Sequence, residues 1–295
     1  VTYQTFKGET FHSVGVGAIL ALVGVFITAI LLIKNVKGGI LIGIIATWVL
    51  GMICEACGIY VPDPAAGMYS TIPSSIVSFD FTPFKETFGA VFRADFHSIK
   101  LVDFIVVMFA FLFVDMFDTI GTLIGVSSKA DMLDENGKLP RIKPALLSDA
   151  IATCVGAVFG TSTTTTFVES ASGVTAGGRT GLTSIVTAVL FLLSIVFSPL
   201  FLTIPSFAIA PALIIVGFYM MGAVAKINFE DMSDAIPAFL CIVAMPLAYS
   251  ISEGISVGVI SWTLVNLVTG KAKEKKISIV MYVLTVLFIL KYILL

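Results

Sequence analysis

Charged residues are scarce in this chain. Asp, Glu, Lys and Arg make up 12% of its 295 residues, about half of the share found in typical soluble domains. Hydrophobic residues make up 58%, and the mean hydropathy is +1.06. The apolar runs are long and continuous, without the short alternating pattern of barrel strands. The composition therefore excludes an ordinary soluble domain and predicts an all-α polytopic membrane protein.

Cysteine and histidine are also rare, with four cysteines and two histidines in the whole chain. All four cysteines fall in apolar segments, and Cys54 and Cys57 form a CxxC pair. A zinc or redox site would need a second pair or a nearby histidine, and neither is present. We interpret Cys54 and Cys57 as small buried residues, and we expect no metal and no cofactor.

Nine hydrophobic segments and one irregular segment are expected along the chain. A polar region with four prolines, residues 60–100, separates the second segment from the third, and its FKETFGAVFR is predicted to form a short interfacial helix. A Ser-Glu-Gly break at 252–254 separates the seventh from the eighth, with Glu253 solvated. The ninth would either span the membrane or lie in its interface. The segments are 14–33, 39–59, 101–126, 144–159, 182–201, 204–225, 234–249, 255–268 and 277–295.

Lysine and arginine are distributed unequally between alternate loops. Twelve of the 17 basic residues fall in one set of loops, which the positive-inside rule places in the cytoplasm. Arg179, in GGRTG, is expected to anchor a helix end at that face. The third segment then runs from outside to inside.

Two aspartates interrupt the third segment, in the stretch FLFVDMFDTIGTLIG at 111–125. A carboxylate at the centre of a membrane helix costs about 2.5–3.5 kcal/mol. Asp115 and Asp118 are three residues apart and share one helical face, which Thr119 and Thr122 extend. Such a face must meet a protein interior or a watery cavity, and it predicts a path for a solute or an ion.

A second polar stretch, GTSTTTTFVESASGVTAGG at 160–178, falls at membrane depth but is a poor membrane helix. Its threonines favour an extended chain, which is allowed there only where it lines a cavity or is buried in protein. We expect a short strand leading into a half helix, as in the binding sites of secondary transporters. Glu169 would stand at the start of that half helix, where the helix dipole favours a carboxylate. Alternatively, the threonines pack helices together.

The two blocks DMFDTIGTLIG and TSTTTTFVESASGVTAGGRTG, with KGGILIGI and YSISEGISVG, resemble the nucleobase:cation symporter-2 superfamily. The similarity is to its AzgA-like branch of adenine/guanine/hypoxanthine permeases. It implies a 7+7 inverted-repeat fold, with a substrate held between two half helices that each start from a short strand. This chain would be the C-terminal part of that fold, lacking the first five spans.

The same resemblance implies a division into domains. Residues 1–59 would be the sixth and seventh spans, in the gate domain, and 60–100 an extracellular loop. Residues 101–203 would form the core domain with the substrate and proton site, and 204–269 further gate spans. A basic loop and a C-terminal apolar segment would complete the chain at 270–295.

The function that the resemblance implies is import of purine nucleobases across the cell (plasma) membrane by proton symport. Na⁺ is the alternative coupling ion, and a homodimer is the candidate assembly. Neither enzymatic activity nor a nucleic-acid partner is expected. Two other functions stay open: an anion transporter of the same general fold, and an intramembrane Mg²⁺-dependent enzyme acting on lipid diphosphates. Both would need basic residues beside the acids or in the broken helix, and none is there.

By motif, Asp115 and Asp118 match acids of the family's eighth helix, and Glu169 matches the acid of its tenth. Glu169 is the candidate contact to the base and Asp118 the candidate proton site, with the opposite assignment left open. Asp115 would orient Asp118 or cap a neighbouring helix end, and Glu55 has no assigned role. The candidate site residues are Asp118, Glu169, Asp115, Thr119, Thr122, Thr165, Thr166, Phe167 and Ser170.

Overall fold

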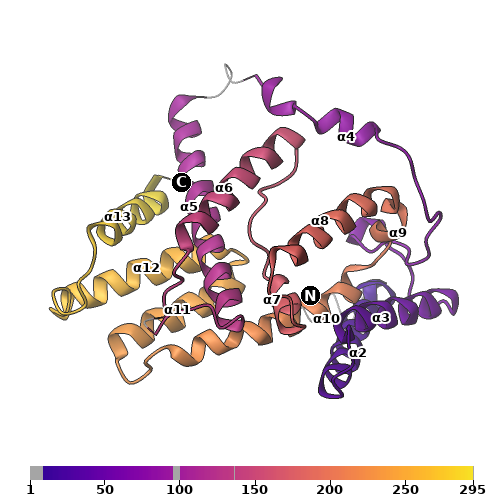
Figure 1. Ribbon diagram of the computed structural model, residues 1–295, viewed down its shortest axis with the longest axis horizontal. Coiled ribbons are helices and arrows are strands. Elements are labelled where there is room, and N and C mark those ends of the chain that lie inside the picture. The colour runs from indigo at the N-terminus through magenta and orange to yellow at the C-terminus, as the bar shows by residue number, and fades with distance from the viewer. Residues whose placement is uncertain (1–8, 96–99, 136, 295) are drawn as a thin grey trace. The chain divides into compact units, whose positions relative to one another are not determined.

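A computed structural model describes residues 9–95, 100–135 and 137–294 (Figure 1). Within these ranges the chain is built from helices and loops, and the one β-type pairing is an isolated bridge between Asp63 and Met68. The all-α prediction is therefore confirmed. Residues 1–8 of the first predicted gate segment, 96–99 of the predicted loop and Leu295 of the last predicted span lie outside the described residues.

Nine apolar helices match the nine predicted hydrophobic segments. Five of the described helices are long and apolar enough to cross a membrane, and four are shorter. The chain is therefore a multi-pass membrane protein. The long helices are α2 (Val14–Ile33), α3 (Gly39–Ala56), α5 (Leu101–Lys129), α6 (Ile142–Phe159) and α12 (Ile251–Val268); the shorter ones are α8 (Gly181–Val196), α10 (Ser206–Met220), α11 (Met232–Ala248) and α13 (Ile279–Leu294).

Short helical turns connect these helices. The predicted helix in FKETFGAVFR forms as α4 and η3, which are separate pieces. The others occur at loop ends and at the irregular segment. Their bounds are η1 (Glu9–His12), η2 (Pro64–Ala66), α4 (Thr82–Thr87), η3 (Ala90–Phe92), α7 (Ser170–Thr175), α9 (Ser198–Leu202) and η4 (Met221–Lys226).

The chain divides into two compact units. Unit 1 comprises residues 1–87, 125–132 and 167–220, and unit 2 comprises residues 88–124, 133–166 and 221–295. Unit 1 contains α2, α3 and α10 packed together, and unit 2 contains α11, α12 and α13. These units are defined by contacts within the chain. The division into core and gate domains, which the family resemblance implies, stays a prediction.

Small residues let α2, α3 and α10 pack closely in unit 1. A Cβ on Gly24 would lie 2.5 Å from Thr47 Oγ1 and 2.7 Å from Pro211 Cγ, and a Cβ on Gly43 would collide with Thr28 Oγ1. The arrangement is reciprocal, since each helix places a glycine opposite the partner's threonine. Both threonine hydroxyls donate to a carbonyl one turn back, at 2.8 Å. Close packing by small residues is the usual way in which membrane helices associate.

Glu55, which had no assigned role, fastens a loop onto α3. Its carboxylate accepts hydrogen bonds from Ser70 Oγ, Thr71 N and Thr71 Oγ1, each at 2.6 Å. The indole of Trp48 donates to the Thr71 carbonyl at 2.8 Å, and the Tyr60 hydroxyl donates to the carbonyl of the residue before Ser70 at 3.0 Å. Residues 67–71, here named the strap, are thus held by five hydrogen bonds at three consecutive residues, 69–71. Glu55 is a structural anchor in unit 1.

The prediction that Glu253 is solvated was wrong. Helix α12 begins at Ile251, before the predicted break, because the Ser250 side chain accepts the Glu253 backbone N–H at 3.2 Å. The Glu253 carboxylate pairs with Lys291 Nζ of α13 at 2.5 Å and also accepts the Tyr292 hydroxyl. Farther along α12, Thr285 of α13 donates to Thr263 at 2.9 Å. These contacts hold α13 against α12 near the start and in the second half of α12. Whether α13 spans the membrane or lies in its interface stays a prediction.

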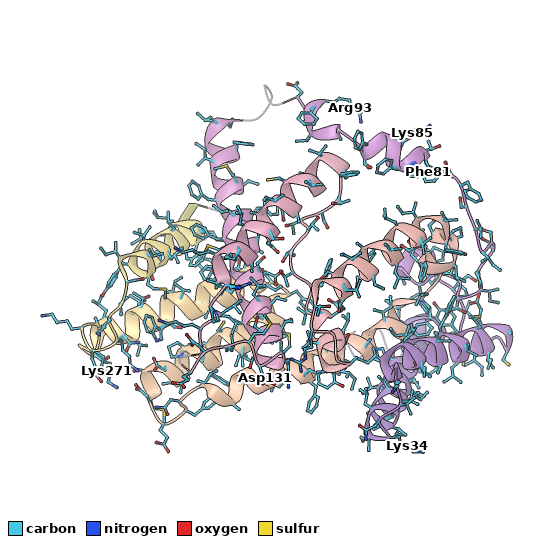
Figure 2. The ribbon with its side chains drawn as sticks, in the orientation of Figure 1. Lys34, Phe81, Lys85, Arg93, Asp131 and Lys271 are labelled. Atoms are coloured by element: carbon cyan, nitrogen blue, oxygen red, sulfur yellow. The ribbon has the colours of Figure 1, made fainter. Side chains whose placement is uncertain are left out.

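The basic loop after α12 is tied to the start of α11. Asp231 caps α11 by accepting the Ser233 N–H at 3.1 Å, and it pairs with Lys275 at 2.6 Å and Lys271 at 3.0 Å. Figure 2 shows Lys271 in this loop and Lys34 at the end of α2. The hydrogen bond from Lys275 is the main cause that lowers the pKa of Asp231, and its bonds to Asp231 and Asp234 raise the pKa of Lys275.

The prediction for Arg179 agrees with the structure, whereas the prediction for the two cysteines of the CxxC pair agrees only in part. Arg179 Nη1 donates to the Ala130 carbonyl at 2.6 Å, directly after the last residue of α5. The prediction that it anchors a helix end is confirmed. Cys54 is half-buried and Cys57 is exposed, so the buried reading was wrong for Cys57, which stands just after the last residue of α3.

Candidate functional site

The polar face of α5 turns into the protein, as predicted. Thr119 is fully buried and Thr122 is 4% exposed. Asp115 and Asp118, one turn earlier, are half-buried. Because these residues repeat every three or four positions, the helix brings all four to one side.

The helix breaks where the second polar stretch begins. Helix α6 ends at Phe159, and Gly160 follows with φ of +77°, a left-handed conformation that glycine adopts without strain. Residues 161–169 are non-helical, and α7 begins at Ser170. The break was predicted, but the expected strand was wrong: no strand forms at 161–169. A strand needs a second strand to pair with, and the described part of the chain provides none there.

Threonine side chains take the place of strand pairing. Thr163 Oγ1 donates to Asp115 Oδ1 at 2.5 Å, and Thr165 Oγ1 lies 3.0 Å from Thr119 Oγ1. Toward α6, Thr153 Oγ1 lies 3.4 Å from the carbonyl oxygen of Thr164 and donates to it. The segment is therefore fastened by side chains to α5 on one side and α6 on the other. The alternative reading of the threonines, as residues that pack helices together, describes part of their role.

Asp149, a residue that sequence reasoning missed, joins the segment to both helices. It lies on α6 and accepts Thr119 Oγ1 of α5 at 3.0 Å through one oxygen and Thr166 Oγ1 at 3.1 Å through the other. A hydroxyl has one proton, so Thr119 donates to Asp149 and accepts from Thr165. The available signal was an acid inside the apolar run LLSDAIATC, the same signal that identified Asp115.

Gly156 allows the segment to lie against α6. It is buried, and a Cβ there would come 2.8 Å from Thr161 Oγ1 and would collide with Thr164 Oγ1. The pattern GxxxxT, from Gly156 to Thr161, is also closed by a backbone bond from Thr161 N to the Gly156 carbonyl at 3.0 Å. A larger residue at 156 would displace the segment from the helix.

A pocket of about 410 Å³ lies between α5, α6 and this segment. Its polar lining includes Asp115, Asp118, Thr153 and Thr163, and its apolar lining includes Phe111. Pockets for small organic ligands typically measure about 300–1,000 Å³ and combine apolar walls with a few polar groups. Asp115 is engaged by Thr163, whereas the Asp118 carboxylate has no hydrogen-bond partner among the described residues. The arrangement offers a free carboxylate to a small polar solute.

Three of the predicted site residues belong to unit 1, whereas Asp115 and Asp118 belong to unit 2. Glu169 directly precedes α7, as predicted, and its exposed side chain makes no capping hydrogen bond. Phe167 is 54% exposed and Ser170 is exposed. That these three share a site with the aspartates stays a prediction. Thr165 and Thr166 are half-buried and belong to unit 2 with the aspartates.

Comparison with known proteins shows which protein family the chain belongs to. Residues 4–257 match the sequence profile described as the permease family. The chain is 44% identical over 268 residues to the guanine/hypoxanthine permease PbuO of Bacillus subtilis, covering 89% of this chain and 57% of that protein. It is 43% identical to PbuG of the same organism (93% and 58%) and 38% identical to the adenine permease AdeP of Escherichia coli (98% and 60%). The chain thus spans less than two thirds of the length of these relatives.

Proposed function

This chain belongs to the permease family, and on that premise we propose that it forms part of a secondary active transporter that imports purine nucleobases by proton symport. The relatives named as guanine/hypoxanthine and adenine permeases support the substrate class. The observation that carries the proposal is the pocket on α5, where Asp118 offers an unengaged carboxylate at membrane depth. Acids inside membrane helices are rare and mark solute or proton pathways.

The chemistry of a purine suits such a site. Its ring edges carry N–H donors and ring-nitrogen or carbonyl acceptors. A carboxylate can accept hydrogen bonds from the donors, two of them in parallel where two N–H groups are adjacent, as in guanine. Backbone groups of the non-helical segment 161–169 can bind the remaining polar atoms. Glu169 is the candidate for the carboxylate contact to the base, and the opposite assignment with Asp118 is the alternative.

Asp118 is the candidate proton carrier because of how the neighbouring acids are used. Asp115 and Asp149 accept hydrogen bonds from threonines that hold the segment in place. Protonating either acid would weaken a structural contact. Asp118 can take up and release a proton without breaking one, and the spans of the gate domain would then move against the core to alternate access.

Uptake measurements test this proposal. The chain is expressed alone, and also joined to the N-terminal part of PbuG, in cells that lack their own nucleobase carriers. Radiolabelled hypoxanthine, guanine, adenine and uracil are supplied with and without a protonophore. We expect the joined protein to take up at least one purine in preference to uracil, and we expect the protonophore to abolish this uptake.

Matched variants separate the site from general damage. Asp118→Asn should abolish proton-coupled uptake, and Glu169→Gln should raise the KM for the base. Glu135→Gln, at an exposed loop acid, should do neither. If Asp118→Asn still concentrates purines in a protonophore-sensitive manner, the assignment of the proton site is wrong. If the joined protein reaches the membrane and takes up no purine, the substrate class is wrong.

A further inference from the structure

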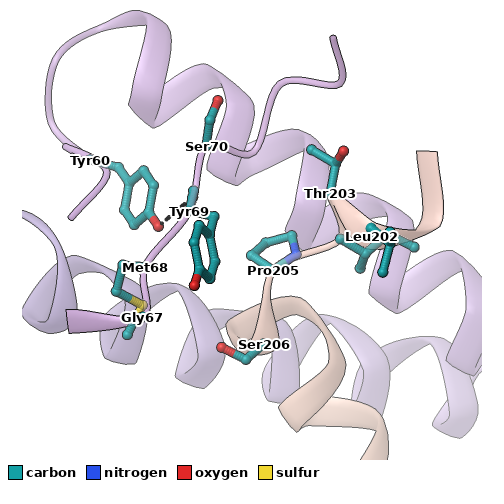
Figure 3. Close-up of a pocket in the computed structure, with 10 residues that line it drawn as sticks. Tyr60, Gly67, Met68, Tyr69, Ser70, Leu202, Thr203, Pro205 and Ser206 are labelled. Atoms are coloured by element: carbon teal, nitrogen blue, oxygen red, sulfur yellow. Dashed lines mark hydrogen bonds between the residues drawn. The ribbon is translucent and has the colours of Figure 1, made fainter. Parts of the chain in front are cut away.

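A second pocket, of about 220 Å³, lies within unit 1. The strap forms one side of it, and the corner between α9 and α10, residues 202–206, forms the other (Figure 3). Every residue involved belongs to unit 1, whereas the pocket beside Asp118 lies in unit 2. The positive-inside rule predicts that this end of unit 1 lies on the outer side of the membrane.

The walls of this pocket are held in place. On the strap, Ser70 donates to Glu55 at 2.6 Å, and the Tyr69 carbonyl accepts the Tyr60 hydroxyl at 3.0 Å. Tyr60 itself is 1% exposed and packs against Phe207 with ring centroids 5.6 Å apart. A site whose walls are already ordered binds a ligand without the entropic cost of ordering them.

The opposite wall is fixed as well. Thr203 Oγ1 donates to the Pro199 carbonyl at 2.6 Å, which closes the last turn of α9. Pro205 follows and restricts the backbone directly before α10. Glu55 thus has a consequence beyond stability, because Ser70, which it binds, and Tyr69, which Tyr60 binds, both line the pocket. None of the transport steps proposed above uses this acid.

The lining determines which chemistry the pocket accepts. Among the described residues, no Lys, Arg, His, Asp or Glu lines it. From these residues a charged ligand would lose its hydration without gaining a charged partner. Figure 3 shows the Tyr69 ring beside Pro205, with the tyrosine hydroxyl directed to the side of Ser206. These two hydroxyls have no partner among the described residues, and each can donate and accept. The aromatic face favours a flat ligand.

The size of the pocket sets an upper limit on the ligand. At about 220 Å³ it is smaller than the 300–1,000 Å³ typical of drug-sized ligands. We propose that this pocket is a binding site for an uncharged, planar heteroaromatic molecule of one or two rings that carries a carbonyl or ring-nitrogen acceptor. The site is separate from the pocket beside Asp118, and its existence does not depend on the proposed transport function.

Equilibrium binding to the chain in lipid nanodiscs tests the proposal. The probes are radiolabelled hypoxanthine, nicotinamide and nicotinate; the last two share a ring and differ in charge. All measurements use an Asp118→Asn, Glu169→Gln background, so that binding at the proposed transport site does not contribute to the signal. We expect saturable binding of hypoxanthine or nicotinamide, and at least tenfold weaker binding of nicotinate.

Two variants locate the binding. Ser206→Phe fills the pocket and should weaken binding at least tenfold, whereas Ser184→Phe, on the exposed face of α8, should leave it unchanged. Glu55→Gln loosens the strap without filling the pocket and should weaken binding to a smaller extent. Melting temperatures of all variants are measured in parallel. Absence of saturable binding of either neutral probe would overturn the proposal, and so would unchanged binding in a folded Ser206→Phe variant or equal binding of nicotinate.

Discussion

Removing the Asp149 carboxylate should release the non-helical segment from α5 and α6. Asp149→Ala deletes the acceptor for both Thr119 and Thr166. Hydrogen bonds between membrane helices are each worth about 0.6 kcal/mol on average and up to about 1.7 kcal/mol. Two of them amount to about 1–3 kcal/mol, and the fully buried Thr119 hydroxyl keeps Thr165 Oγ1 as its remaining partner. Asp149→Asn keeps one acceptor oxygen and should lose about half as much.

This loss should appear in two assays. The melting temperature of the chain in nanodiscs should be lowered by Asp149→Asn and lowered further by Asp149→Ala. In the uptake assay, the maximal rate divided by KM should fall. If the whole loss of about 1–3 kcal/mol acts on the transport site, the decrease is about 5- to 150-fold. Ser148→Ala, an exposed neighbour on α6, is the control and should change neither quantity.

A double-mutant cycle decides whether Asp149 acts through Thr166. Thr166→Val removes the same hydrogen bond from the other side, so the double variant should be little worse than Asp149→Ala alone. Strictly additive losses would show that the two residues are independent, and the reasoning from the 3.1 Å contact would fail. If Asp149→Ala had the same melting temperature and uptake as the control Ser148→Ala, the structural role of Asp149 would be refuted.

Three further predictions concern other contacts. Glu55→Gln should destabilise the strap by about 1–3 kcal/mol, because its amide nitrogen would face donors that now bind a carboxylate; Trp48 fluorescence, in a Trp262→Phe background, should shift at lower denaturant concentration, and an unshifted transition would contradict the anchor. Gly43→Ala should lower the melting temperature through collision with Thr28, whereas Gly217→Ala, which meets open space, should raise it through better helix propensity; equal effects would contradict close packing of α2 and α3. The depressed pKa of Asp231 means that its contribution to stability is present above the ordinary value of 3.8 and is lost as pH falls below it, while the raised pKa of Lys275 means a loss only as pH rises above 10.5; Asp231→Asn should remove part of the acid-side decline in melting temperature, and an unchanged acid limb would contradict the ion pair.

The amino-acid sequence by itself determined the class of protein and the positions of its apolar helices. Long apolar runs specify membrane helices because only internally hydrogen-bonded segments are stable in lipid. The three-residue spacing of Asp115 and Asp118 likewise placed both acids on one face, because helix geometry fixes which side chains are neighbours. The helix break after Phe159 followed from local composition in the same way.

Only the tertiary structure decided which acids are engaged and by what. Asp149 meets Thr119 across 30 residues of sequence, Glu55 meets Thr71 across 16, and Glu253 meets Lys291 across 38. No local pattern specifies such pairs, because they depend on how separate helices pack. The expected strand at 161–169 was wrong for the same reason: β-propensity describes one segment, but a strand exists only when a second one lies beside it. The distinction between an occupied Asp115 and an unengaged Asp118, on which the proposed proton site rests, is therefore a property of the folded chain.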